Sequence, residues 1–446
     1  MIYRLLRALS RLLLAIFYRR VDVVGLEHVP AAGPLVVVAN HHNALIDAAL
    51  LLAAIPRRLA PVAKAPLFHH PVLGPLLRSV GAIAAHRREE GGTDPARNEA
   101  LFAQAVARLR EGTGIVIFPE GVSHPEPMIR PLRTGSARIV LAAAEAEAAP
   151  VTVLPVGLVF YHPGAFRAGS AIVVIGSPVI TADLVGAEGR DRAQLVRELT
   201  DRIGRALRDL IVEVEDRQTF RLLQLAEALW RDEGPADAVA VTARLQRAAR
   251  AMRWLRGHEP GRLEGVRHSI TAYAGALGEL GLSDEAIIST YSVRSVLRYT
   301  LDETARLLLG VPLAFLGVLL HWVPYRLTGM VAQLVTSDAD MEATNKLVAG
   351  ALIFPMGWAL EVWLVWRIAG PGAVLVLLAV LGPLGLLALG WQQRLRSVRR
   401  QARGLWLFLR DRRRHAQLVA QRAALVEALR GLVTLVPESV LAESRR

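Results

Sequence analysis

The sequence predicts an α/β domain, a mixed sheet flanked by helices, followed by a helical region and C-terminal transmembrane helices. Val- and Ile-rich runs alternate with helical stretches over residues 21–182, the pattern of a layered α/β domain. Charged amphipathic sequence with few strand signals fills residues 183–300. Strongly apolar segments then lie within residues 301–391, before a basic helical tail over residues 392–446.

Short elements within the first part support the α/β assignment. The predicted strands cover residues 34–40, 112–121, 151–160 and 171–179. The predicted helices cover residues 98–112 and 134–148, and Gly112 ends the first of them.

Residues 1–20 predict a basic amphipathic helix that lies in a membrane interface. Apolar residues recur at helical spacing from Ile2 to Phe17, while Arg4, Arg7 and Arg11 fall on another face. The apolar run is too short, and too interrupted by arginines, for a secretory signal peptide. The alternative is a helix packed on the protein itself.

Three apolar segments are each near the ~20 residues needed to span a bilayer. They cover residues 307–325, 347–366 and 371–391. Only the tetrapeptide RIAG separates the second from the third, which predicts a helical hairpin. Pro312 and Pro324 leave the first open as a re-entrant or interfacial piece.

The flank after the third segment indicates orientation. Residues 392–415 hold nine arginines and one aspartate, which is typical of a cytoplasmic flank. If only the hairpin spans, the α/β domain is cytoplasmic too, whereas if all three segments span, the domain and the tail lie on opposite sides. The first arrangement is favoured. The sequence thus predicts a multi-pass protein of the cell inner (cytoplasmic) membrane. Glu361, an ionisable group at membrane depth, is a functional candidate.

Composition narrows the function classes. The net charge of +13 favours anionic partners such as lipid headgroups, and no recognition motif indicates nucleic acid. The chain has no cysteine, which excludes a thiolate nucleophile, a disulfide and a Cys-ligated zinc.

The nonapeptide ANHHNALID, residues 39–47, places two histidines after a buried strand and an aspartate about one helical turn further on. With Asn43 as a helix N-cap, Asp47 lies in the first turn, where the helix dipole favours a carboxylate. A histidine folded back onto it makes the base and orienter of a catalytic triad without the nucleophile. A metal site and an ordinary polar turn are the alternatives, and no further ligand at metal spacing accompanies the pair.

Later motifs follow in an order that resembles the phospholipid/glycerol acyltransferase family, which acylates glycerol-3-phosphate and lysophosphatidate. After the histidine–aspartate block come Gly81–Arg87, Phe118–Gly121 and Leu154–Val156. The resemblance covers about residues 20–180. The family spacing of four residues before the aspartate selects His42, whereas a histidine directly after the strand-closing Asn selects His41. Spacing to Asp47 favours His42.

The resemblance implies direct acyl transfer with no cofactor and no metal. The histidine, oriented by Asp47, takes a proton from the acceptor hydroxyl, which attacks the thioester of acyl-CoA or acyl-carrier protein. The implied partners are membrane lipids and a phosphate-bearing glycerolipid acceptor. The arrangement in which only the hairpin spans is favoured because an acyl donor carried by coenzyme A would be cytoplasmic. The implied substrate-binding positions are Arg87, Glu120 and Gly121, with Pro119, Phe118 and Gly81 from the same blocks and Arg133 and Lys64 as weaker candidates.

Other interpretations stay open. The chain can be a non-catalytic lipid-binding membrane protein built on such a domain. Arg87 can belong to a solvated charged face, and Glu120 can simply cap its turn. The remaining histidines of this part are scattered, with His69 and His70 interpreted as helix surface and no role predicted for His86 or His124.

Overall fold

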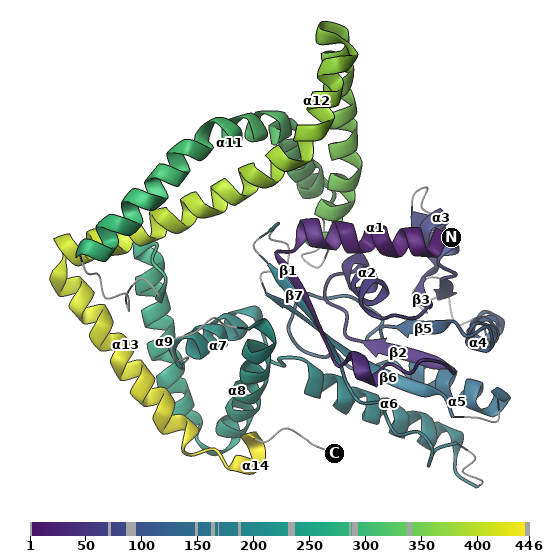
Figure 1. Cartoon of the computed structure of the whole chain (residues 1–446). Helices are drawn as coiled ribbons and strands as arrows, with labels where there is room; N and C mark the ends of the chain where they lie inside the picture. The colour runs from purple at the N-terminus through teal and green to yellow at the C-terminus, as the bar shows by residue number, and fades with distance from the viewer. Residues whose placement is uncertain are drawn as a thin grey trace.

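The computed structural model confirms the predicted fold class, a mixed α/β sheet followed by helices (Figure 1). Seven strands pair in the order β1-β7-β6-β2-β5-β3-β4. Every neighbouring pair is parallel except β6 and β7, which are antiparallel. The strands are β1 (Arg20–Val24), β2 (Leu35–Ala39), β3 (Leu59–Lys64), β4 (Ile83–Ala85), β5 (Gly114–Ile117), β6 (Thr152–Tyr161) and β7 (Ser170–Ile175).

The structure describes residues 2–69, 73–85, 95–147, 150–161, 166–167, 169–185, 189–230, 237–284, 287, 293–336 and 341–441.

Helices cover both faces of the sheet, as the alternation of buried residues in β2 requires. Val36 and Val38 pack toward α5 and α6, whereas Leu35 and Val37 pack toward α1 and α2. The covering helices are α1 (Ile2–Phe17) and α2 (Leu45–Ala54) on one face, and α4 (Pro95–Arg110), α5 (Gly135–Glu147) and α6 (Arg192–Leu210) on the other. Shorter helices connect the strands: η1 (Leu26–His28), η2 (Ala65–His69) and α3 (Leu73–Ser79).

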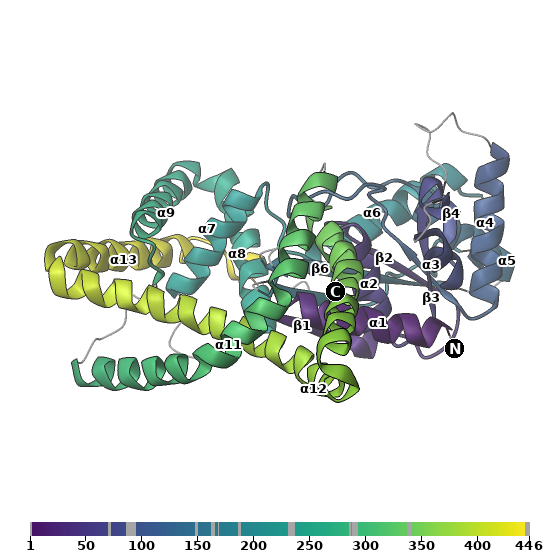
Figure 2. The same ribbon diagram turned by 90° about the horizontal axis from the view of Figure 1, so that it is seen from above.

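A second group of helices lies beside the β1 edge of the sheet in both Figure 1 and Figure 2. It consists of α7 (Arg217–Trp230), α8 (Ala238–His258), α9 (Pro260–Leu280), α13 (Arg412–Val433) and α14 (Glu438–Leu441). The C-terminal helices thus return to pack on the middle of the chain. Helix α6 packs on the sheet, although it lies beyond residue 182, the predicted end of the α/β domain. The division into domains stays a prediction.

Helix α1 forms as predicted, and its apolar stripe faces outward. Its exposed large apolar residues are Ile2, Leu5, Leu9, Leu12 and Ile16. Arg7 and Arg11 join the helix to α2, because both donate to the Ala53 carbonyl, at 3.5 and 3.0 Å. Helix α1 therefore packs on α2 while it offers an apolar surface to its surroundings.

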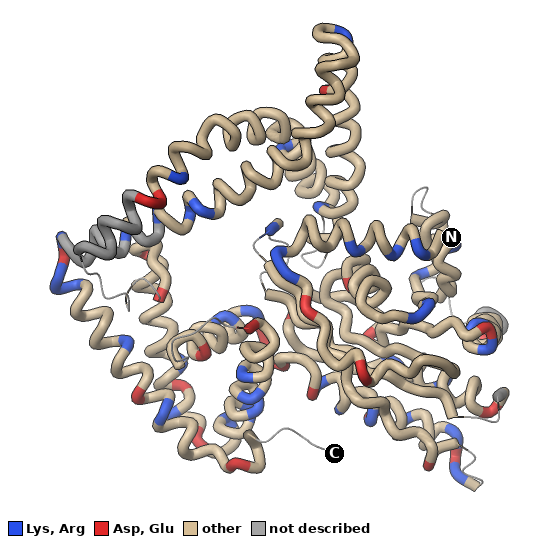
Figure 3. The backbone as a smooth tube through the Cα atoms, in the orientation of Figure 1, with Lys and Arg blue, Asp and Glu red and all other residues tan. Residues whose placement is uncertain are grey.

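Two long helices carry the apolar segments: α11 (Val293–Val335) and α12 (Glu342–Arg410). By length and composition, Asp302–Val335 and Glu342–Arg399 are candidates to cross a membrane. Helix α12 reverses direction at Gly370, which confirms the predicted hairpin (Figure 1). Helix α11 is continuous through both of its prolines and packs along α12. Charged residues are sparse along the pair in Figure 3 and are frequent again on α13.

Candidate active site

The nonapeptide forms a tight turn between β2 and α2 that brings His41 onto Asp47. The strand ends at Ala39 and the helix begins at Leu45. Asp47 is fully buried, and its Oδ2 accepts a hydrogen bond from His41 Nδ1 at 2.8 Å. Ala44, within the turn, has a φ of 42°, a strained region for a non-glycine residue.

The expectation that Asp47 orients His42 is wrong. Asp47 Oδ2 accepts the backbone N–H of His42 at 2.7 Å and that of Asn43 at 2.8 Å. These bonds hold the His42 main chain against the carboxylate, so its ring points elsewhere, and His42 Nδ1 donates to the His124 carbonyl at 3.1 Å. The spacing argument failed because the turn is not helical.

The expectation that Asn43 caps α2 is also wrong. Ala44 is the N-cap residue, and it forms no side-chain capping bond. The carboxylate of Asp47 instead reaches back to backbone N–H groups before the helix, as the acidic member of a capping box does.

His42 is buried and His41 is partly open. Burial lowers the pKa of His42, because its charged form is poorly solvated there. The side chain of His41 is 18% exposed. Its ring stacks on Phe118, with the two ring centroids 4.1 Å apart and an interplanar angle of 13°.

Glu120 anchors the same turn from β5. Its buried carboxylate accepts the backbone N–H of His41 on Oε1 at 2.8 Å and that of Arg130 on Oε2 at 2.8 Å. His124 Nε2 hydrogen-bonds the same Oε2. Burial alone raises the pKa of Glu120, but the hydrogen bonds from His124 and the Arg130 backbone outweigh it and lower that pKa.

The rest of the Phe118–Gly121 block shapes the turn after β5. Gly121 has a φ of 74°, and a Cβ there would lie 2.7 Å from the Arg133 side chain. The Pro119 carbonyl accepts the backbone N–H of Arg133 at 2.7 Å. Glycine is therefore required where the exposed Arg133 side chain covers the turn.

Asn40 joins the turn to the long strand β6. Its Nδ2 donates to the Leu158 carbonyl at 2.9 Å, and its Oδ1 accepts from the Leu158 N–H at 2.6 Å. These bonds continue the pairing of β2 with β6 beyond the end of β2. His41 is thus held by Asp47, Phe118 and Glu120, and the turn that carries it is joined to β6 through Asn40.

Comparison with known proteins finds an acyltransferase match in this part of the sequence. The Acyltransferase family model matches residues 20–159, which contain the His41–Asp47 pair and the Glu120 turn. Residues 20–159 are an acyltransferase domain.

Proteins with sequences similar to this chain are acyltransferases by name. An uncharacterized acyltransferase of Schizosaccharomyces pombe is 28% identical over 45% of this chain and 30% of its own length. Glycerol-3-phosphate O-acyltransferase 1 of Saccharomyces cerevisiae is 22% identical over 60% of this chain and 37% of its own. Human 1-acyl-sn-glycerol-3-phosphate acyltransferase alpha is 27% identical over 37% of this chain and 56% of its own. The chain therefore spans less than two thirds of each of these relatives.

A solved structure is also similar. The 1-acyl-sn-glycerophosphate (LPA) acyltransferase of Thermotoga maritima aligns with a TM-score of 0.34 and 20% identity, over 47% of this chain and 79% of that chain.

The other predicted positions of the acyltransferase domain are dispersed. Lys64 is the last residue of β3, so it lies at the carboxyl ends of the parallel strands, as His41 does, and it is exposed. Gly81 lies before β4, separated from β2 by β5 and β3, with a φ of 75° and the Arg108 guanidinium next to it. Arg87, His70 and His86 lie outside the described residues. His69 is exposed. No group of three or more metal-ligating side chains occurs among the described residues.

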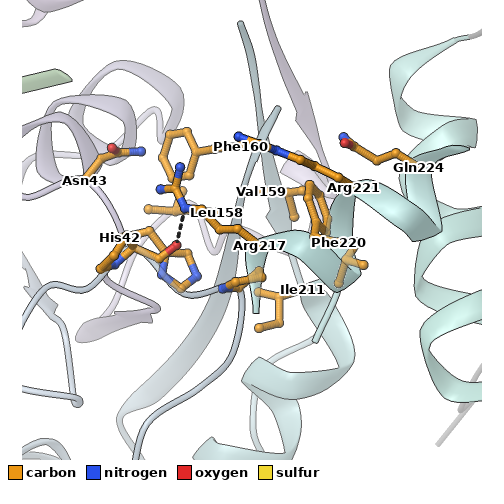
Figure 4. A pocket seen from close by; sticks show the side chains of 13 residues that line it. His42, Asn43, Leu158, Val159, Phe160, Ile211, Arg217, Phe220, Arg221 and Gln224 are labelled. Carbon is orange, nitrogen blue, oxygen red and sulfur yellow. Dashed lines mark hydrogen bonds between the residues drawn. The ribbon is translucent and has the colours of Figure 1, made fainter. Parts of the chain in front are cut away.

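A cavity of about 220 Å³ opens beside the turn (Figure 4). His42 and Asn43 form one side of it, and Arg217 and Arg221 reach into it from α7. Sequence reasoning missed the α7 arginines, which lie far from the domain's motifs along the chain. It also missed His124, although the spacing of His124 four residues after Glu120 was a usable signal.

Proposed function

We propose that this chain is a membrane-bound O-acyltransferase of phospholipid biosynthesis. It moves a fatty acyl group from acyl-CoA or acyl-carrier protein to a hydroxyl of glycerol-3-phosphate, dihydroxyacetone phosphate or lysophosphatidate. The observation that supports this most directly is the His41–Asp47 hydrogen bond inside an acyltransferase domain.

His41 is the proposed general base. A carboxylate oxygen only accepts hydrogen bonds, so the proton of a neutral His41 ring lies on Nδ1 and the Nε2 lone pair is free to act as a base. Nε2 takes the proton of the acceptor hydroxyl as that oxygen attacks the thioester carbonyl carbon. The C–S bond then breaks, and the leaving thiolate takes the proton back from the imidazolium.

Neighbouring residues position this base. Asp47 stabilises the imidazolium, and Phe118 supports the ring from one face. Glu120 holds the main chain of His41 through its N–H and is proposed as a positioning residue, because its buried carboxylate faces protein donors. Arg87, Arg133 and Lys64 remain proposed contacts of the acceptor. No metal or other cofactor takes part in this proposal.

The membrane location belongs to the same proposal. The outward apolar stripe of α1 lies in the interface, and the apolar helices α11 and α12 anchor the chain as a multi-pass protein of the inner membrane. The acyltransferase domain then faces the cytoplasm, where coenzyme A thioesters occur. An acceptor with an acyl chain can reach such a site without leaving the bilayer.

The test is thiol release from a long-chain acyl-CoA by detergent-purified full-length protein, with glycerol-3-phosphate and lysophosphatidate as parallel acceptors. Release with one acceptor only supports the enzyme and identifies its step. If acyl-CoA and an acyl-carrier-protein donor both give no release, the non-catalytic lipid-binding alternative replaces this proposal.

Variants then test the base. His41→Ala is expected to lower kcat by about 10²–10⁴-fold, the range of general-base catalysis. His42→Ala is expected to lower kcat less and to lower the melting temperature. His69→Ala is the matched control, since His69 is exposed and ends η2 after β3, which β5 separates from β2. Full activity of His41→Ala would overturn the assignment.

A further inference from the structure

The cavity beside the active-site turn occupies a gap in the sheet. Strand β2 ends at Ala39, whereas β6 continues to Tyr161. The apolar wall of the cavity comes from Leu158, Val159 and Phe160 of that extension, and α7 closes the opposite side. The gap lies at the carboxyl ends of the parallel strands, where α/β sheets commonly bind ligands.

Two arginines of α7 enter this cavity without an acidic partner. Arg217 is half-buried, and its Nε donates to the Pro125 carbonyl at 2.9 Å. Across the described ranges, neither Arg217 nor Arg221 forms an ion pair. Burial lowers the pKa of Arg217, and the like charge of Arg221 lowers it further, against a smaller opposing influence of Glu126 and Glu342. The cavity therefore holds two positive charges that no acidic side chain contacts directly among the described residues.

Asn43 supplies a third donor from the opposite wall. Its side chain is buried, with the residue 2% exposed, and its Nδ2 has no hydrogen-bond partner among the residues described. In Figure 4 the Asn43 side chain lies across the cavity from α7, and both arginines extend toward it and His42. A buried amide without an acceptor costs about 1–3 kcal/mol, which a bound acceptor group would recover.

We infer that Arg217, Arg221 and Asn43 form a subsite for the phosphate group of a substrate. The three side chains all donate, and a phosphate provides several acceptor oxygens and the missing negative charge. The cavity, at about 220 Å³, is below the usual 300–1,000 Å³ of sites for larger ligands and fits a small polar head. This inference rests on the proposed function, which it extends to a helix outside the family match.

The acceptor is the expected source of that phosphate. In glycerol-3-phosphate and lysophosphatidate only a few bonds separate the reacting hydroxyl from the phosphate. In acyl-CoA the long pantetheine arm separates the thioester from the phosphates. A phosphate held against His42 and Asn43, next in sequence to His41, therefore belongs to the acceptor.

The kinetic test uses Arg217→Gln and Arg221→Gln in the full chain. Each variant is expected to raise the acceptor KM about 10-fold or more, with the acyl-CoA KM unchanged. A rise in the acyl-CoA KM alone would keep the phosphate subsite but assign it to the donor. Unchanged KM values for both substrates in active variants would overturn the subsite and leave the proposed enzyme standing.

Controls separate binding from folding. Arg217→Lys keeps the charge and is expected to restore part of the affinity. Arg247→Gln, on the exposed side of α8 and away from the cavity, is expected to leave all KM values unchanged. Arg221 is exposed, so Arg221→Gln tests the subsite even if Arg217→Gln is unstable.

A binding measurement works without turnover. Inorganic phosphate and glycerol-3-phosphate are expected to raise the melting temperature of the wild-type protein, and not that of the R217Q/R221Q double variant. Stabilisation of an inactive wild-type protein would support the subsite while the proposed function fails. Equal stabilisation of both proteins would overturn the subsite.

Discussion

At the scale of single residues, Asp47 determines which nitrogen of His41 carries a proton. Three donors, His41 Nδ1 and the backbone N–H groups of His42 and Asn43, bond the same Oδ2 of Asp47, so in Asp47→Asn the amide oxygen keeps that place and the variant removes the negative charge that stabilises the imidazolium. We expect kcat to fall about 10²–10⁴-fold, the range that a positioned acid–base group contributes. Steady-state kinetics with the preferred acceptor measure this, and Asp201→Asn on the exposed side of α6 is the control. Near-normal kcat for Asp47→Asn would contradict a role of the Asp47 charge in catalysis.

His42 gives the stability a pH dependence of known sign. Burial lowers the pKa of His42 in the folded state below its unfolded value near 6.5, so the unfolded chain binds more protons in that window. Its stabilising contribution is fully present above about pH 6.5 and is lost as the pH falls through the folded-state pKa. The slope reaches at most about 1.4 kcal/mol per pH unit.

Melting temperatures of the wild-type protein and His42→Asn between pH 7.5 and 5 test this. Asparagine keeps a donor for the His124 carbonyl but does not titrate. We expect the variant to show a flatter decline toward low pH. Parallel curves would show that other groups cause the decline.

Sequence reasoning found the site residues more readily than their geometry. Local patterns predicted the end of the strand, the position of Asp47 and the turn that holds Glu120. A strand end and the turn after it are both visible in the residue types of a few neighbouring positions. The choice between His41 and His42 depended on the path of an irregular turn with a strained Ala44, which no spacing rule encodes. Arg217 reaches the cavity through packing between distant segments, so no local signal existed for it.

At the scale of elements, α11 and α12 pack through a glycine. A Cβ on Gly317 would lie 2.3 Å from the Leu384 carbonyl oxygen, so Gly317→Ala must push the two helices apart. We expect a loss of about 1–3 kcal/mol, read as a lower melting temperature in detergent. Gly329→Ala in the same helix is the matched control, since nothing lies within 4 Å of its Cβ position. Equal melting temperatures would show that the helices do not pack this closely in solution.

Elements themselves were well predicted where a pattern is local. Strands β2, β5, β6 and β7, helix α1 and the reversal at Gly370 follow from periodicity, composition and the four-residue connection, whereas β1 and β3 were not predicted. The continuous path of α11 through Pro312 and Pro324 did not follow, because neighbouring helices can support a proline-containing helix. The sequence also did not predict which apolar faces of α11 and α12 pack together, because one apolar surface resembles another in sequence.

At the scale of the whole molecule, the base of α12 touches the active-site turn. Thr344 Oγ1 donates to the Asn43 carbonyl at 3.0 Å, a contact between residues 301 positions apart. Ala343 and Leu347 pack in the same core cluster as α2. The start of α12 and helix α2 of the acyltransferase domain therefore pack together beside the turn that holds His41.

This contact predicts that α12 supports the geometry of the turn and thereby the proposed catalysis. Thr344→Val removes the hydroxyl but keeps the shape, and leaves the buried Asn43 carbonyl without that donor. The carbonyl keeps the backbone N–H of Ile46 at 2.9 Å, so the loss is that of one hydrogen bond, about 0.5–1.5 kcal/mol, and we expect the turn to loosen and kcat to fall several-fold. Thr328→Val is the matched control, because its hydroxyl bonds only within α11, to the Pro324 carbonyl. If both variants keep kcat within twofold of wild type, the Thr344 contact does not support catalysis. If only Thr344→Val is slow, the geometry of His41 depends on the contact of the turn with α12.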